Sequence, residues 1–197
     1  MGPLWQALFW GVLLWSGWQP YDRATWLLEV LPALIAWALL MGTRQRFCFT
    51  PLLYSLILIH CLILMVGGKY TYALVPAGDW VSEWLGWSRN NYDKLGHLAQ
   101  GFIPAMVARE LLIRLHVVNG IAWRHSLIVL SVVGISALYE LIEWAVALLS
   151  AEAAESFLGT QGYIWDTQSD MFMALIGAIA ALLMLGGVHD RQLRQQT

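Results

Sequence analysis

Residues 90–100 read Asn-Asn-Tyr-Asp-Lys-Leu-Gly-His-Leu-Ala-Gln and open a long apolar segment. Asp93 and His97 stand four residues apart in this stretch, so on a helix both side chains lie on one face, one turn apart. Ionisable side chains are costly inside a membrane and usually have a function there. This stretch therefore predicts the start of a membrane helix that carries a functional site.

The composition predicts a membrane protein. Of 197 residues, 59% are hydrophobic and 12% are charged, with a mean hydropathy of +0.60, whereas soluble domains carry about 25% charged residues. A chain of this size cannot bury so much apolar surface, so we expect an all-α, polytopic bundle of transmembrane helices that forms one domain over residues 1–197. The net charge of -2 says nothing about nucleic acid, but no basic tract is long enough to bind one. Membrane lipid is therefore the expected partner.

The apolar segments predict about six spans. They cover residues 4–18, 26–41, 47–68, 92–116, 124–149 and 165–187. Between the third and the fourth, Trp80, Trp84 and Trp87 stand at roughly helical spacing, which indicates either a short amphipathic helix in the headgroup region or a simple belt of interfacial aromatic side chains. Arginines in the second and fourth connections and in the C-terminal tail predict that both termini are cytoplasmic.

Two later spans repeat the pairing of ionisable groups. Glu140 and Glu143 stand three residues apart late in the fifth span, and Asp166 and Asp170 stand four apart at the start of the sixth. With six spans and cytoplasmic termini, both pairs lie at the same depth as the first pair, just below the outer (periplasmic) surface. The three pairs are therefore expected to meet.

Five carboxylates and one imidazole cannot all be charged in a pocket of low dielectric constant without a counter-charge. A divalent cation is the simplest remedy, and these ligands suit Mn, Fe, Mg or Ca, with Zn also admissible. The predicted metal ligands are Asp93, His97, Asp166 and Asp170. The competing interpretation is that the acids cap helices and hold the bundle together by hydrogen bonds. Asp93 and Asp166 are well placed for this as N-caps or first-turn acids.

A metal at this depth predicts a membrane-embedded hydrolase that acts on an envelope lipid or polyprenyl substrate. Glu140 and Glu143 are the candidate catalytic residues, one of them as general base. Arg89, Tyr139 and Gln161 are the candidate substrate-binding residues. Two alternatives remain open, namely an ion- or proton-coupled transporter that uses the acids as a relay, and a non-catalytic accessory protein of the envelope.

Several motifs together resemble the YjdF-type bacterial inner-membrane proteins. They are Tyr70-Thr71-Tyr72 with Val75-Pro76, Ser88-Arg89-Asn90 followed by Tyr92-Asp93-Lys94 and His97, the run from Ser136 to Trp144, and Leu158-Gly159-Thr160-Gln161-Gly162 followed by Trp165-Asp166 and Asp170-Met171. The family loop has an Asp where this chain has Tyr163, so no role that needs an acid there is expected. The chain is also distantly similar to VanZ-like membrane proteins through its Asp-Lys-x-x-His opening. These resemblances imply an envelope setting and no particular reaction.

Overall fold

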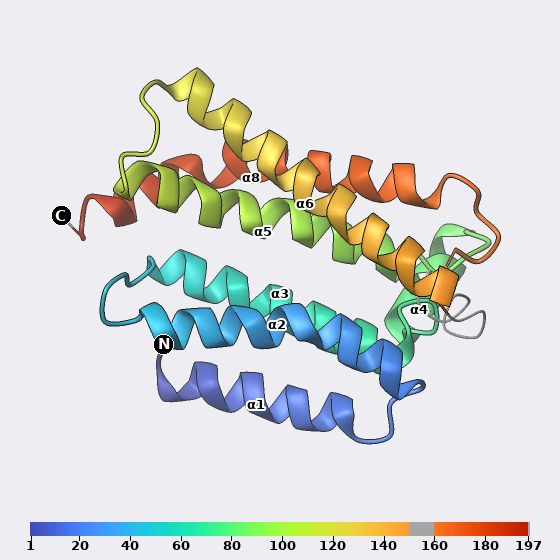
Figure 1. Cartoon of the computed structure of the whole chain (residues 1–197). Helices are drawn as coiled ribbons and strands as arrows, with labels where there is room; N and C mark the ends of the chain where they lie inside the picture. Colours follow the sequence, from blue (N-terminus) through green and yellow to red (C-terminus); the bar gives the residue numbers. More distant parts are fainter. Residues whose placement is uncertain (150–159, 197) are drawn as a thin grey trace.

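The computed structural model describes residues 1–149 and 160–196, and all regular structure within these ranges is helical (Figure 1). The helices are α1 (Pro3–Gly17), α2 (Arg23–Thr43), α3 (Pro51–Tyr70), α4 (Pro76–Leu85), α5 (Tyr92–Arg114), α6 (Ile121–Leu149) and α8 (Asp166–Leu193). The all-α prediction is confirmed for this part of the chain. Of the motif that precedes Trp165, Leu158 and Gly159 lie outside the described residues.

Four of the described helices, α2, α3, α6 and α8, are long and apolar enough to cross a membrane. α1 has 15 residues, a rise of about 22 Å, which is shorter than a hydrocarbon core of about 30 Å. α5 carries charged residues near both of its ends, which lowers its hydropathy. Of the six predicted spans, four are therefore supported by length and composition, and α1 and α5 stay a prediction.

The helices alternate in direction, so both termini lie at one end of the bundle (Figure 1). The opposite end, called the site end here, holds the starts of α2, α5 and α8 and the end of α6. α5 lies inside the bundle, where it packs against α3, α6 and, most extensively, α8. Neighbouring helices therefore surround the polar side chains of α5.

Small residues bring the backbones of α5 and α8 into direct contact. A Cβ atom on Gly101 would meet the carbonyl oxygen of Ala174, and one on Gly177 would meet the carbonyl oxygen of Leu98. Only glycine at these positions lets the two helices approach this closely. The close approach brings the first turn of α8 to the first turn of α5.

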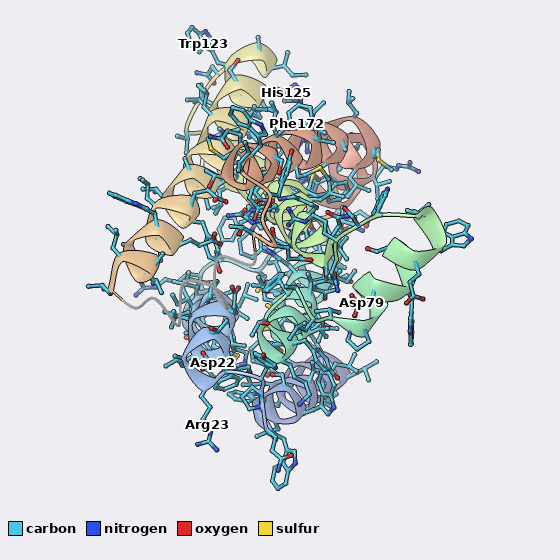
Figure 2. The ribbon with its side chains drawn as sticks, turned by 90° about the vertical axis from the view of Figure 1, so that its right-hand side faces the viewer. Asp22, Arg23, Asp79, Trp123, His125 and Phe172 are labelled. Atoms are coloured by element: carbon cyan, nitrogen blue, oxygen red, sulfur yellow. The ribbon has the colours of Figure 1, made fainter. Side chains whose placement is uncertain are left out.

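α4 is the amphipathic helix predicted before the fourth span. Trp80 and Trp84 on its outer face are 71% and 84% exposed. On its inner face, Ser82 donates to the carbonyl oxygen of Arg89 at 2.6 Å, and Asp79 accepts from Asn90 at 2.8 Å. Viewed from the site end, α4 projects from the side of the bundle (Figure 2, where Asp79 is labelled). Its exposed tryptophans suit the headgroup region of a bilayer.

The starts of the helices decide between the two placements considered for Asp93 and Asp166, and both are first-turn acids. Asp22 is the N-cap of α2 and accepts from the backbone N–H of Thr25 at 2.7 Å. The N-cap residues of α5 and α8 are Asn91 and Trp165, and neither makes a side-chain cap hydrogen bond. The acids considered as caps of α5 and α8 therefore lie inside the first turns, and their carboxylates have other partners.

Candidate functional site

The charged groups at the site end form two sets, of which the first is an ion-paired half. Lys94 Nζ lies 2.6 Å from Oδ1 of Asp166 and 2.6 Å from Oδ1 of Asp170. A guanidinium nitrogen of Arg89 lies 2.9 Å from the same Asp166 oxygen. The ring of Tyr163 stacks near both cations, at 5.3 and 5.8 Å from its centroid. The two carboxylates of α8 are therefore matched by two cations.

The second set is an acid-rich half that surrounds His97. Its Nε2 atom lies 3.4 Å from Oδ1 of Asp93, 3.8 Å from Oε1 of Glu140 and 3.8 Å from Oδ1 of Asp170. An oxygen of Glu143 lies within 4.8 Å of both an oxygen of Glu140 and a ring nitrogen of His97. His97 and both glutamates are buried. Carboxylates thus outnumber cations in this half.

Gln100 determines which nitrogen of His97 faces the carboxylates. Nδ1 lies 3.0 Å from Oε1 of Gln100, and an amide oxygen can only accept, so Nδ1 carries a proton. Nε2 then presents either a lone pair or a second proton to the three surrounding oxygens. A lone pair that faces carboxylates is stable only with a cation between them.

One oxygen of the acid-rich half has no hydrogen-bond partner among the described residues. It is Oε1 of Glu140, which is buried. A buried carboxylate oxygen without a donor is costly. A tetrahedral divalent ion with bonds of about 2.1 Å places its ligand atoms about 3.4 Å apart, close to the 3.4–3.8 Å between His97 Nε2 and its neighbouring oxygens. The residues present therefore fit a divalent ion.

Glu29 of α2 adds a further acid from the other side. It is 3% exposed, and its Oε2 accepts from the hydroxyl of Tyr139 at 2.8 Å. Tyr72, just after α3, is also buried at this end. Burial, and secondarily the nearby Glu29 carboxylate, raise the pKa of the Tyr72 phenol well above its usual value. Both tyrosines are thus hydroxyl donors next to acids.

The acid-rich half forms one end of a groove of about 940 Å³. α2 forms one long wall, and α3 and α5 form the floor. On the other side α6 lines only the half near the site end, with side chains from residues 135–143. Its polar end is lined by Glu29, Tyr72, Asp93, His97, Tyr139 and Glu143. Leu39 and Leu138, on opposite walls, are each 61% exposed, so the groove opens to the side of the bundle.

The structure brings the predicted site residues to one end and gives them different surroundings. Asp93, His97, Glu140 and Glu143 belong to the acid-rich half, and Asp170 lies between the two halves. Two groups of side chains have ligand atoms within 4.8 Å of one another, namely Asp93–His97–Asp170 and His97–Glu140–Glu143. Asp166, a predicted ligand, belongs to neither group and contacts Lys94 and Arg89 instead.

The three predicted substrate-binding residues also separate. Tyr139 lines the groove, whereas Arg89 is in the ion-paired half. Gln161 exchanges two hydrogen bonds with the backbone of Asn90, at 3.0 and 2.8 Å. Its amide therefore holds the loop before α8 against the segment before α5.

Three site residues were absent from the predicted set. Glu29 is a lone acid in an apolar span at the depth of the other acids, and that depth was the available signal. Lys94 directly follows Asp93, and Gln100 lies three residues after His97 on the same helical face. Which partners they take depends on how the helices pack.

A second buried polar cluster lies at the end of the bundle that holds the termini. Glu110 accepts from the backbone N–H and the hydroxyl of Thr50 at 3.1 and 2.8 Å, and from Arg114 at 2.8 Å. Oε2 of Glu110, which accepts from the Thr50 hydroxyl, also pairs with Nε2 of His189 at 2.9 Å. This cluster was missed because α8 was predicted to end at residue 187, before His189.

Comparisons with known proteins agree with this description. The family model for "Predicted membrane protein (DUF2238)" matches residues 2–191. The chain is 53% identical over 184 residues to the "Inner membrane protein YjdF" of Escherichia coli (strain K12), a match that covers 93% of this chain and 88% of that protein. No solved structure matches. The resemblance inferred from the motifs is confirmed, and the chain belongs to the DUF2238 family of predicted membrane proteins.

Proposed function

We propose that this protein is a membrane-embedded hydrolase that cleaves a bond in the headgroup of an envelope lipid with the help of a divalent metal ion. One observation carries the proposal: Asp93, His97 and Glu143 of the acid-rich half line the polar end of an apolar groove that opens sideways. The unpartnered oxygen of Glu140 lies beside them, 3.8 Å from Nε2 of His97. A lipid is the ligand class with a polar head joined to an apolar chain, and the groove has the matching polarity.

The site lies at the outer face of the inner membrane in this proposal. The relative from Escherichia coli is by its printed name an inner-membrane protein. Arg44 and Arg46 between α2 and α3, and Arg191 and Arg194 near the C-terminus, favour a cytoplasmic position for the end that holds the termini. The site end then faces the periplasm.

The chain's own residues divide the work in this proposal. Nε2 of His97 with an oxygen of Glu140 would hold the ion, with Glu143 beside them and Gln100 fixing the imidazole. When bound, such an ion supplies Lewis acidity and lowers the pKa of water. Glu143 accepts a proton from a water molecule as the water oxygen attacks the headgroup. It then donates this proton to the oxygen of the leaving group.

Elemental analysis of the purified protein in detergent tests the metal site. We expect near-stoichiometric metal in the wild type after loading with Mn, Fe, Mg or Zn, and loss of it in His97→Ala and Glu140→Gln. Asp166→Asn is the matched control, because its carboxylate already pairs with Lys94 and Arg89. Unaltered metal content in His97→Ala, or no metal in the loaded wild type, contradicts the proposal.

Hydrolysis is measured on the same samples with farnesyl phosphate and phosphatidic acid as probes. Phosphate release by the loaded wild type that is absent from Glu143→Gln, with metal retained, supports Glu143 as the base. Equal release by both forms contradicts that role.

A proton-coupled transporter is the second candidate, favoured by the buried Glu110–His189 pair. Glu110 lies on the same helix as His97, about 20 Å farther along α5, and His189 lies on α8, which carries Asp170 at the site end. Proton flux into proteoliposomes that stops in Glu110→Gln supports this function. Flux equal to that of empty vesicles excludes it.

A further inference from the structure

The groove is as long as the hydrocarbon core of a bilayer. Its lining on α5 runs from Asp93 to Leu115, which is about 33 Å of helix rise, against a core of about 30 Å. Phe47 and Phe49 line it at the end that holds the termini. The groove therefore passes through both leaflets, whereas an acyl chain of a glycerolipid occupies about half of the core, or about 15 Å.

The deeper part of the groove suits hydrocarbon. His60 and Gln100 line it at mid-depth, and beyond them toward the end with the termini its described lining is apolar except for Thr43. Leu31 and Ile35 on the α2 wall are 44% and 50% exposed, and Ile142 on the α6 wall is 52% exposed. A chain can thus enter the groove sideways from the bilayer.

We infer that the groove holds the chain of a long polyprenyl phosphate, with the phosphate at the acid-rich half and the chain extending past the bilayer midplane. This inference rests on the proposed function for the cation that joins the phosphate to the acids. The length of the groove favours a polyprenyl chain over an acyl chain, because a glycerolipid would leave the half near Phe47 and Leu115 unfilled.

Two substitutions block only the deep half. Val107 lines the floor 14 residues beyond Asp93 on α5, about 21 Å along the helix and so past the midplane. Leu39 lines the α2 wall, and a larger side chain is tolerated there because this position is 61% exposed. Leu183→Trp is the control, since this α8 residue is 80% exposed and does not line the groove.

Binding of radiolabelled long-chain polyprenyl phosphate is compared with binding of farnesyl phosphate and phosphatidic acid, on immobilised protein in detergent micelles. We expect the wild type to prefer the long chain. Val107→Trp and Leu39→Trp lower the ratio of long-chain to farnesyl affinity by about tenfold, because an indole in the path overpacks the groove. Leu183→Trp keeps the wild-type ratio.

The outcomes separate the two proposals. Equal affinity of the wild type for phosphatidic acid and the long chain, or an unchanged ratio in both tryptophan variants, overturns the polyprenyl inference even if metal and hydrolysis are present. The second outcome is a protein that shows no metal and no hydrolysis, but prefers the long chain in the wild type and loses this preference in the tryptophan variants. That result keeps the groove assignment and overturns the hydrolase.

Discussion

Tyr139 of α6 donates its hydroxyl hydrogen to Oε2 of Glu29 in α2 across 2.8 Å. The two residues are 110 positions apart in the chain. Both line the groove, Glu29 from α2 and Tyr139 from α6. Their hydrogen bond links these two helices at the polar end, where α2, α5 and α6 bring acids together.

Tyr139→Phe removes the donor and leaves the buried Glu29 carboxylate with one partner fewer. We expect the free energy of unfolding to fall by about 1–2 kcal/mol, because an unpaired buried acceptor loses its compensation. Thermal unfolding in detergent measures the change. Tyr21→Phe, at an exposed position, is the control and should leave the melting temperature unchanged. Equal melting temperatures for all three proteins would contradict the role of the bond.

Gln100→Leu removes the acceptor of the His97 Nδ1 proton. We expect metal affinity to fall by about 10- to 100-fold, as is typical when the partner of a ligating histidine is lost. Titration of the apoprotein with metal measures the affinity. Gln100→Glu retains an oxygen acceptor and should bind at least as tightly as the wild type. If both variants bind alike, Gln100 does not position the imidazole.

Lys94→Met leaves the buried carboxylate of Asp166 with Arg89 and that of Asp170 with only the His97 imidazole nearby. We expect a loss of about 3–5 kcal/mol in the free energy of unfolding, because breaking a buried ion pair from one side leaves an uncompensated charge. Adding Asp170→Asn to this variant should recover part of the loss. If the two residues do not interact, the loss of stability in the double variant equals the sum of the losses in Lys94→Met and Asp170→Asn. That outcome would contradict the ion pair.

Gly101→Ala forces α5 away from α8, because its Cβ meets the backbone oxygen of Ala174. Overpacking of this kind costs about 1–3 kcal/mol, and we expect a lower melting temperature in detergent. Gly186→Ala on α8 meets nothing within 4 Å and should be neutral or slightly stabilising, since alanine favours helix by about 1 kcal/mol. The opposite order of the two variants would contradict the packing.

Asp22 makes the start of α2 sensitive to acid. Its hydrogen bonds with Thr25, mainly the one from the backbone N–H, hold its pKa below the usual range. A lowered folded-state pKa stabilises the protein above the unfolded value of about 3.9, and this contribution disappears as the pH falls through the folded-state pKa. Asp22→Asn keeps a capping group that does not titrate. We expect the melting temperature of the wild type, relative to Asp22→Asn, to decline from about pH 5 to about pH 2, and a constant difference would exclude this cap as the cause.

The helices and the depth of the acids could be predicted from the sequence because both depend on local order. Runs of apolar residues must form helices in a bilayer, since their backbone groups have no other partners there. The spacing of Asp93 and His97, or of Glu140 and Glu143, places each pair on one helical face whatever the fold. The small residues Ala174, Gly177 and Ala178 likewise share one face of the helix because of their spacing.

The tertiary structure alone decided how the charges are shared. Composition showed too many acids for the nearby cations, but the close approach of α5 and α8 at Gly101 and Gly177 assigns Lys94 to the acids of α8. The acids around His97 are therefore the ones left without a matching cation. The groove likewise depends on the separation of α2 and α6, because a cavity is a property of packed helices and no single segment of the chain encodes it.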